Sequence, residues 1–399
     1  MLMLFSRFDA GGAERIALDL LGRLRARGLE IGAAAMYGGG QWADRFAAAG
    51  SFFRDGLASG RFDLLSILRT ARLIRRERVD TVLIVDAVKN AMIAGLWGSA
   101  LSGRAVRRVL WCHACPGHEL SGRMAGFIAR LRRSAGRLGS IICVAKWQRR
   151  ELEKLGVPGE KMTVIENGVE LARFVRSAVR SPAVRRSSDA LTDTLRADDL
   201  GTLPLNALTG TLRTHARREL GLPLDAFLLV QVANYWPEKD PTWLLEALST
   251  ARSKGASPNL HLALVGRGMN GPPVRAIIER LGLAGAVTPA GYRDDVPRWL
   301  AAADAFVLAS AHETQSIAAI EAMAAGLPLI VADIPGFADL VQDGRSGLKC
   351  PPGDVAALAG CIRRLADDPD LRANLARQAA LAAQAYDVET AADRFASLL

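Results

Sequence analysis

No run of 18 or more apolar residues occurs in this sequence of 399 residues, although 50% of the residues are hydrophobic. The longest candidate, residues 91–101, is too short to cross a bilayer and contains two glycines, so no membrane-spanning helix is expected. The N-terminus also lacks a basic region followed by an apolar one, which predicts no secretory signal. We therefore expect a cytoplasmic protein.

Cysteine is scarce, with five residues in the chain. An odd number in a chain of this length is typical of a reducing compartment and argues against a disulfide framework. Cys112 and Cys115 form a C-x-x-C pair, which alone fits a redox site or half of a zinc site. No second pair follows at zinc-site spacing, and the nearby His113 and His118 could not easily complete a tetrahedron from one strand end. No metal site is predicted.

Acidic residues are scarce in one part of the chain. Residues 101–150 carry eleven basic side chains and one acid, Glu119, and the net charge of the whole chain is +10. Residues 1–150 carry 25 basic and 11 acidic side chains, whereas residues 151–399 carry 26 and 30. Such a basic region suits nucleic acid or an anionic membrane. Interleaved aromatic residues are few there and no nucleic-acid-binding motif is present, so an anionic membrane surface is the expected partner, on the inner face of the membrane, and nucleic acid is not.

Residues 121–136 leave two interpretations open. The segment combines four arginines with four large apolar residues, namely Arg123, Arg130, Arg132, Arg133, Met124, Phe127, Ile128 and Leu131. A helix of this kind can lie on anionic lipid with its apolar face among the head groups. The same pattern also fits a helix with a basic solvated face and an ordinary packed face.

Short apolar segments alternate with longer amphipathic ones in two series along the chain, which predicts parallel sheets covered by helices on both faces. The expected fold class is α/β, with two Rossmann-like doubly wound domains and ligands at the C-terminal ends of the strands. A segment rich in Arg, Ser, Thr and Asp separates the two series, and residues 369–399 are predicted to form a long Ala-rich helical stretch. The predicted organisation is an N-terminal domain at 1–174, a linker or mobile insertion at 175–216, a C-terminal domain at 217–375 and a C-terminal helix at 376–399 that returns to the first domain.

Three expected strand ends carry residues suited to phosphate binding. Gly11 and Gly12 lie between a strand and a helix, where they can let backbone N–H groups approach a phosphate, although a plain tight turn needs the same residues. Lys239 follows the first strand of the second series and could reach a diphosphate, although a solvated lysine is common at such a place. Gly266 and Arg267 begin a G-x-G pattern. This is shorter than the dinucleotide fingerprint, so a nicotinamide cofactor is not expected.

The segment from His312 to Pro328 carries the strongest signal. Thr314 or Ser316 can cap a helix there, and Glu321 is the only charged residue between Ile317 and residue 325. A carboxylate on a helix that is apolar all round is costly unless something pairs with it, and the hydroxyl groups of a ligand would do so. Glu313 precedes the helix at the mouth of the expected site, where the helix N-terminus can hold a phosphate. The alternative is a surface position for Glu313 and a Glu321 side chain that extends from the helix to reach solvent.

These motifs together resemble the retaining nucleotide-sugar glycosyltransferases of family 4, which have the GT-B fold of two Rossmann-like domains facing across a cleft. Residues 313–328 match the family's E-x7-E signature, and "GGAER" at 11–15 matches its N-terminal glycine loop. "VIENGVELARF" at 164–174 is similar to its interdomain segment, and "PGFADLVQDGRSGLKCPPGD" at 335–354 resembles its C-terminal part. The resemblance covers nearly the whole chain except the predicted insertion.

The resemblance implies roles for single residues. Lys239 would bind the donor diphosphate, Glu321 the ribose hydroxyls and Glu313 the transferred sugar. His113, in "WCHACPG", resembles the acceptor-side histidine of the family, although a packed histidine at a strand end fits as well. The implied catalytic residues are therefore Glu313, Lys239 and His113. The implied donor-binding residues are Gly11, Gly12, Asn234, Lys239, Gly266, Arg267, Glu313, Ser316, Ile317 and Glu321.

One departure from the family pattern concerns Asn234. Many relatives carry Gly-Arg where this chain has Ala233 and Asn234, and the arginine would add a second positive charge at the diphosphate. Asparagine can donate hydrogen bonds but cannot neutralise charge. We expect the site to tolerate a single cation, with help from Arg267.

The expected function is transfer of a sugar, with retention, from a nucleoside diphosphate sugar to a hydroxyl of a glycan or lipid-linked acceptor in cell-envelope polysaccharide or glycolipid synthesis. By the same resemblance no metal and no cofactor is expected, since the one D-x-D motif, residues 368–370, lies at a predicted helix start. Two alternatives remain open. One is a non-catalytic membrane- or partner-binding protein on this fold, and the other is a nucleotide-sugar epimerase.

Overall fold

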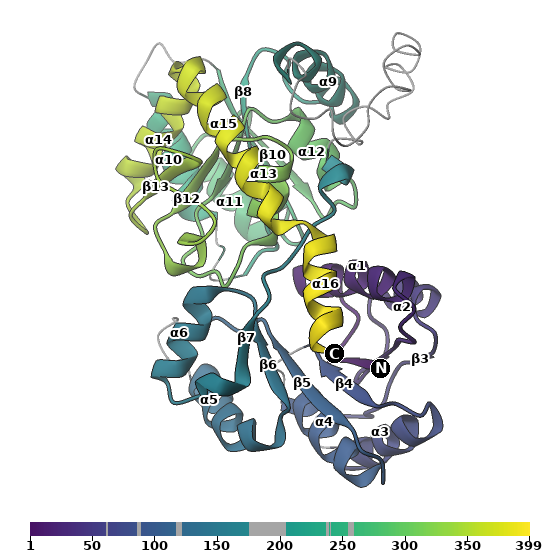
Figure 1. The fold of residues 1–399 in the computed structure, drawn as a ribbon. Helices are drawn as coiled ribbons and strands as arrows, with labels where there is room; N and C mark the ends of the chain where they lie inside the picture. Colours follow the sequence, from purple (N-terminus) through teal and green to yellow (C-terminus); the bar gives the residue numbers. More distant parts are fainter. Residues whose placement is uncertain are drawn as a thin grey trace. The chain divides into compact units, whose positions relative to one another are not determined.

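The computed structural model describes residues 1–60, 63–85, 89–116, 122–174, 205–236, 239, 241–253 and 259–399. By its internal contacts the chain divides into two compact units (Figure 1). Unit 1 consists of Met1–Val169 and Tyr386–Leu399, and unit 2 of Glu170–Ala385. Each unit contains one parallel sheet with helices packed on it, which confirms the expected fold class.

Unit 1 has a seven-stranded parallel sheet in the order β3-β2-β1-β4-β5-β6-β7. Its strands are β1 (Leu2–Phe5), β2 (Gly32–Ala35), β3 (Phe53–Arg54), β4 (Thr81–Ile84), β5 (Arg107–Cys112), β6 (Ser140–Cys143) and β7 (Met162–Val164). Its helices are α1 (Gly12–Ala26), α2 (Ala43–Ala49), α3 (Leu65–Arg76), α4 (Lys89–Leu101), α5 (Gly122–Ser134), α6 (Lys146–Lys154) and α16 (Val388–Leu398), with short 3-10 turns η1 (Ala135–Arg137) and η2 (Gly159–Lys161).

Unit 2 has a six-stranded parallel sheet in the order β10-β9-β8-β11-β12-β13. Its strands are β8 (Phe227–Val232), β9 (Leu260–Val265), β10 (Val287–Gly291), β11 (Ala305–Leu308), β12 (Leu329–Ala332) and β13 (Gly347–Cys350). Its helices are α9 (Leu205–Leu220), α10 (Thr242–Ser253), α11 (Pro272–Arg280), α12 (Val296–Ala302), α13 (Ile317–Ala324), α14 (Val355–Asp367) and α15 (Pro369–Ala383), with 3-10 turns η5 (Pro335–Phe337) and η6 (Gln384–Tyr386), the latter at the boundary with unit 1.

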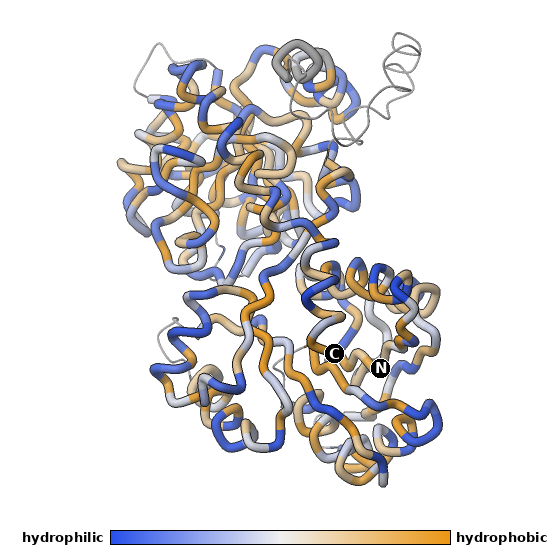
Figure 2. Tube along the Cα trace, in the orientation of Figure 1, coloured by the Kyte–Doolittle hydropathy of each residue, from blue (hydrophilic) through white to orange (hydrophobic). Residues whose placement is uncertain are grey.

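The central strands read as short apolar runs because helices cover both faces of each sheet. β1 (LMLF), β6 (SIIC), β11 (AFVL) and β12 (LIVA) are buried along their whole length. Figure 2 shows hydrophobic colour along the strands of both units. No helix in the described part of the chain is long and apolar enough to span a membrane.

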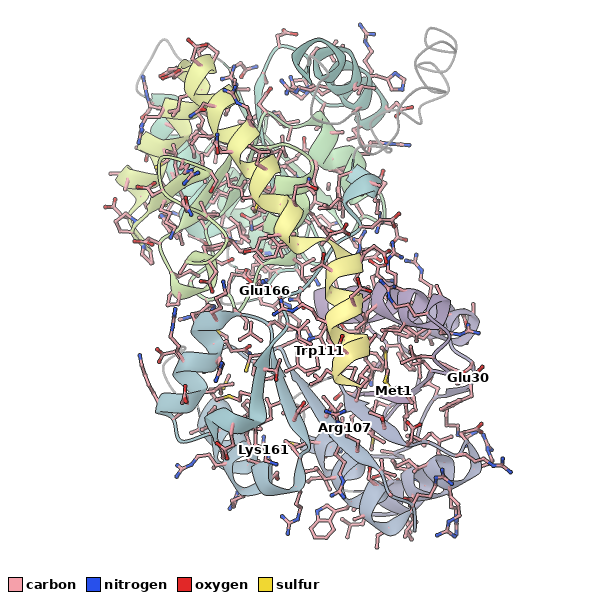
Figure 3. All side chains as sticks on the ribbon, viewed as in Figure 1. Met1, Glu30, Arg107, Trp111, Lys161 and Glu166 are labelled. Atoms are coloured by element: carbon pink, nitrogen blue, oxygen red, sulfur yellow. The ribbon has the colours of Figure 1, made fainter. Side chains whose placement is uncertain are left out.

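The C-terminal helix α16 packs on unit 1. The Arg27 guanidinium, at the end of α1, lies 2.9 Å from a Glu389 carboxylate oxygen and 2.7 Å from one of Asp393. On its buried side, the Phe395 ring packs edge-on against the Trp111 ring, with centroids 4.8 Å apart. Figure 3 labels Trp111 beside α16. Helix α16 is therefore held on unit 1 by ion pairs to α1 and by an aromatic contact with β5.

One sequence expectation about this region was wrong: the predicted boundary at 375/376 falls inside α15 of unit 2. The predicted helical stretch at 369–399 is helical but divided into α15 and α16. Alanine content favours helix along the whole stretch, but the chain leaves the helix after Ala383, and Asp387 caps the next one by accepting a hydrogen bond from the Glu389 N–H (3.2 Å).

The predicted linker at 175–216 is partly wrong as well. Residues 175–204 lie outside the described residues, but residues 205–216 belong to helix α9, which packs on α12. Two of its arginines, Arg213 and the buried Arg217, each lie within 2.7 Å of an Asp304 carboxylate oxygen. The sequence pattern missed this helix because its anchoring residues are charged and their partner lies about 90 residues away.

Candidate active site

The strand order of unit 2 reverses direction between β8 and β11. From β8 the chain proceeds to β9 and β10 on one side, and from β11 it proceeds to β12 and β13 on the other. Doubly wound sheets bind ligands at the carboxyl ends of the strands beside such a reversal. Lys239 follows β8, Gly266 and Arg267 follow β9, and Glu313 follows β11, so three neighbouring strands deliver predicted site residues to this edge.

Lys239 and Glu313 form an ion pair at this edge. The Lys239 Nζ lies 3.0 Å from Glu313 Oε1. The lysine side chain is 30% exposed and the glutamate side chain 7% exposed, so the cation is accessible while the anion is buried. The sequence placed these residues in one site, and the structure joins them across adjacent strands.

Helix α13 begins at Ile317, four residues after Glu313. Ser316 caps it, because its Oγ accepts a hydrogen bond from the Ala319 N–H (3.3 Å), which settles the choice between Thr314 and Ser316. The N–H groups of the first turn therefore follow Glu313 closely in the chain. Glu321 is 4% exposed, which contradicts the surface alternative for this carboxylate.

Asn234 fixes the backbone of the neighbouring G-x-G turn. Its Oδ1 accepts a hydrogen bond from the Arg267 N–H (2.9 Å), and the Tyr235 N–H donates to the Arg267 carbonyl (2.8 Å). Gly266 has φ +142°, and a Cβ there would lie 1.9 Å from the Ala233 carbonyl oxygen, so only glycine permits this approach. The asparagine that departs from the family pattern therefore has a structural role in this chain.

Two residues of this edge were not predicted from the sequence. A Cβ at Gly336 would lie 2.2 Å from the Glu313 carbonyl oxygen, so this glycine lets the segment after β12 lie directly on the Glu313 backbone. The Ser310 hydroxyl, two residues after β11, is fully buried and has no hydrogen-bond partner within the described residues. Gly336 lies in the segment 335–354 that resembles the C-terminal part of the family, so the sequence held a signal for it. Nothing in the sequence indicated Ser310.

In unit 1, Gly11 and Gly12 lie where β1 leads into α1. Gly11 is the N-cap of α1 and Gly12 its first residue, so no side chain caps this helix. β1 neighbours β4 at the reversal of the sheet order, which is the position equivalent to β8 and β11 in unit 2. The structure thus places the glycine pair at a helix N-terminus on the ligand edge of its own sheet.

His113 follows β5 at the same edge of the unit 1 sheet. Its ring lies 4.7 Å from the Trp111 ring, centroid to centroid, and burial lowers the pKa of His113 to about 4. The imidazole is therefore neutral near pH 7, so it can donate or accept a hydrogen bond without adding charge.

Gln148, which the sequence analysis overlooked, holds the segment that carries His113. Its Nε2 donates to the carbonyls of Cys112 (2.9 Å) and Ala114 (2.7 Å), and its Oε1 accepts from the Val144 N–H (2.8 Å). The side chain is fully buried in helix α6. The three hydrogen bonds of this one amide thus connect the end of β5 to the end of β6. Two of them hold the residues directly before and after His113.

The structure decides between the two interpretations of residues 121–136, most of which form α5. Phe127, Ile128 and Leu131 are at most 6% exposed and pack in the core of unit 1, so the packed-face alternative holds. Cys112 and Cys115 are free thiols. No group of three or more His, Cys, Asp or Glu side chains arranged to hold a metal ion occurs in the described parts of the chain.

Known structures with the same architecture share the GT-B fold. HepE from Anabaena, solved with UDP and glucose, aligns with a TM-score of 0.78 and 22% identity over 100% of this chain and 99% of that protein. Sucrose-phosphate synthase from Thermosynechococcus elongatus aligns with a TM-score of 0.74 and 19% identity over 100% of this chain and 97% of that protein. The fold of the chain is therefore GT-B.

Sequence comparison identifies the family. Residues 10–173 match the "Glycosyltransferase Family 4" model and residues 226–368 match the "Glycosyl transferases group 1" model. A D-inositol 3-phosphate glycosyltransferase from Streptomyces avermitilis is 34% identical over 198 residues, covering 47% of this chain and 42% of that protein. The lipopolysaccharide core biosynthesis glycosyltransferase LpsE of Rhizobium meliloti is 31% identical over 176 residues, covering 44% of this chain and 50% of that protein. The chain belongs to the family 4 glycosyltransferases. Its matches cover about half the length of the curated relatives.

Proposed function

We propose that this chain transfers a sugar, with retention of configuration, from a nucleoside diphosphate sugar to a hydroxyl of a glycan or lipid-linked acceptor. The observation that carries the proposal is the Lys239–Glu313 ion pair at the reversal point of the unit 2 sheet. An accessible cation beside a helix N-terminus suits a diphosphate, and a buried carboxylate suits the hydroxyls of a sugar.

Donor binding would separate Lys239 from Glu313 and give each of them a partner on the donor. The diphosphate would take the Lys239 ammonium, and Glu313 would then accept hydrogen bonds from the transferred sugar. Glu321, buried on α13, would bind the ribose hydroxyls, and the backbone N–H groups at Ser316 and Ile317 would lie against the phosphates. Gly266, Arg267 and Asn234 would shape the neighbouring turn.

The proposed reaction is driven by electrostatic stabilisation of the leaving group. The bond between the sugar's anomeric carbon and the diphosphate oxygen breaks with its electron pair going to the diphosphate, where Lys239 and the α13 N-terminus stabilise the added charge. The acceptor oxygen forms its bond to the anomeric carbon on the same face, and its proton passes to the departing diphosphate. The charge is met by protein groups, so we propose that neither metal nor cofactor takes part.

Unit 1 would supply the acceptor side. Gly11 and Gly12 would offer backbone N–H groups at the α1 N-terminus, and the neutral His113 would hydrogen-bond a sugar hydroxyl. The relative named for lipopolysaccharide core biosynthesis supports a cell-envelope glycan as acceptor. We further propose that the enzyme works at the cytoplasmic face of a membrane, on which the basic unit 1 docks.

A donor screen with product analysis tests the proposal. Purified protein is incubated with a panel of nucleoside diphosphate sugars, beginning with UDP-glucose because HepE was solved with UDP and glucose, and products are read by mass spectrometry. The anomeric coupling constant in the product gives the stereochemistry. Glu313→Gln and Lys239→Met should each lower transfer by about 10³-fold. Lys154→Met, which removes an exposed lysine paired with Glu151 in unit 1, should leave it unchanged. Undiminished transfer by both site variants would refute the site, and inverted products would refute retention.

A further inference from the structure

Helices α3 and α4 of unit 1 expose an unusual amount of apolar surface. Among the described residues, nine large apolar side chains are at least 40% exposed, and five of them lie on these helices or the turn before α3. We call them the α3–α4 patch: Leu64 (76% exposed), Leu65, Leu68, Trp97 (46%) and Leu101. Isolated exposed leucines are ordinary, but several on adjacent helices mark an interaction surface.

The two helices that carry the patch pack against each other. Arg75 Nε on α3 donates to the Ser102 carbonyl at the end of α4 (3.0 Å), and a Cβ at Gly98 would lie 2.8 Å from the Thr70 side chain. Since Thr70 lies against Gly98 and Arg75 against Ser102, the helices run in the same direction. Figure 1 shows α3 and α4 as neighbours in unit 1. Since Gly98 lies against Thr70, the neighbouring Trp97 lies at about the level of Leu68.

Basic side chains predominate around the patch. Between Leu65 and Arg76 there are four arginines and no acid. The Arg137 guanidinium lies 5.0 Å from the centre of the Trp97 ring, and Arg72 and Arg104 are exposed beside the two helices. The acids at the ends of α3 are paired, Asp63 with Arg69 (2.6 Å) and Glu77 with Arg76 (2.7 Å).

This combination fits the surface of an anionic bilayer. Leucines can enter the boundary between head groups and acyl chains, a tryptophan prefers that boundary, and arginines reach the phosphates above it. The apolar residues of α5, the other basic helix considered, are buried and unavailable. We propose that the α3–α4 patch docks this chain on anionic phospholipid, with the leucines and Trp97 inserted and Arg72, Arg76, Arg104 and Arg137 on the head groups. The proposal rests on the membrane-linked acceptor proposed above.

Vesicle sedimentation tests the apolar part. Wild type should pellet with phosphatidylcholine vesicles containing roughly one third phosphatidylglycerol, and salt should weaken this binding. The variant Leu65→Ser/Leu68→Ser/Trp97→Ser should bind at least about tenfold more weakly, because three inserted side chains are lost. The matched control Leu224→Ser/Leu381→Ser removes equally exposed leucines of unit 2 and should bind as wild type does. Equal binding by all three proteins would overturn the proposal.

A second pair of variants tests the charged part. Arg72→Gln/Arg76→Gln should weaken binding, whereas Arg132→Gln/Arg133→Gln on α5 should change it less. The reverse order would overturn the assignment to α3 and α4. Light scattering tests whether a second copy of the chain, rather than lipid, covers the patch. A dimer that forms with rising protein concentration and is lost in the Ser variant, in a protein that does not bind lipid, would show that a second copy covers it.

Activity with a soluble acceptor distinguishes this proposal from the proposed function. The Ser variant should transfer sugar to a short soluble acceptor as fast as wild type does, since the patch is separate from the proposed site residues. A protein that binds vesicles through the patch but transfers from no donor would refute the proposed function alone. A protein that transfers sugar but ignores anionic vesicles would refute the docking surface alone.

Discussion

The two units share one architecture but differ in the chemistry at the ligand edge of their sheets. In unit 2, the edge beside the strand reversal carries the Lys239–Glu313 ion pair and the buried Glu321. In unit 1, the equivalent edge carries a glycine pair without a side-chain cap, followed after β5 by a neutral histidine. A charged edge suits a diphosphate, and an uncharged one suits sugar hydroxyls. This difference in site chemistry, rather than the shared fold, is the reason that the proposed function gives the donor to unit 2 and the acceptor to unit 1.

The largest effect is expected from removing the cation of the charged edge. Lys239→Met should lower the rate of sugar transfer by about 10³-fold, the scale seen when one preorganised stabilising group is lost. Lys239→Arg should retain part of the activity because it keeps the charge. The measurement is kcat and KM with the best donor, and Lys154→Met is the matched control.

Stability separates this catalytic effect from a folding defect. Lys239→Met leaves the buried Glu313 carboxylate without its cation, which should cost about 1–2 kcal/mol of unfolding free energy after allowance for the partly exposed lysine. The double variant Lys239→Met/Glu313→Gln should regain stability but no activity. If the double variant regained activity together with stability, the Lys239–Glu313 pair would have only a structural role. The proposed difference in chemistry between the two units would then be wrong.

The second prediction concerns the glycine packed on Glu313. Gly336→Ala places a Cβ within 2.2 Å of the Glu313 backbone, so either segment must shift. Because small displacements of a positioning group are costly, transfer should fall by about 10²-fold. Gly360→Ala, within α14 and with no atom near its Cβ position, should leave transfer unchanged and slightly raise stability by about 0.5–1 kcal/mol. Comparable losses in both variants would show a general sensitivity to alanine.

The third prediction compares one histidine from each unit. Burial lowers the pKa of His113 to about 4, and burial together with Arg252 and Arg217 lowers the pKa of His261, on β9, to about 4. The unfolded chain takes up these protons below about pH 6.5, whereas the folded chain does so only near pH 4. Stability should therefore fall as pH falls from 6.5 to 4, and each histidine should contribute about 2 kcal/mol of the loss between pH 7 and pH 5.

Denaturant unfolding at pH 7 and pH 5 measures this loss. His113→Gln and His261→Gln should each reduce the difference between the two pH values relative to wild type. Only His113→Gln should also impair transfer, because His261 lies on a strand and its Nε2 is bonded to Thr288 Oγ1 (2.8 Å). An unchanged pH difference in His113→Gln would mean that folding does not lower the pKa of His113 in the wild-type chain.

The sequence predicted features that depend on local pattern. Buried parallel strands appear in the sequence as apolar runs, so the two sheets were predictable. A carboxylate on an otherwise apolar helix is costly unless it is paired, so the sequence alone also indicated Glu321 as a site residue. The features that were missed depend on which distant segments meet. Gly336 matters only because it lies on Glu313, and Gln148 only because two strand ends converge on its amide. Helix α9 was missed because Asp304, which pairs with its arginines, is remote in sequence.

The smallest effect is expected at Asn234, whose role the sequence could not show. Asn234→Ala removes the acceptor for the Arg267 N–H, which should cost about 1 kcal/mol of stability and raise the donor KM several-fold as the turn loosens. Asn234→Asp keeps the acceptor and hence the stability, but it adds a negative charge beside the diphosphate and should raise the KM further. Asn374→Ala, on the exposed side of α15, is the matched control. A donor KM unchanged in Asn234→Asp would place the diphosphate away from this turn, and the charged edge would then consist of Lys239 and the α13 N-terminus alone.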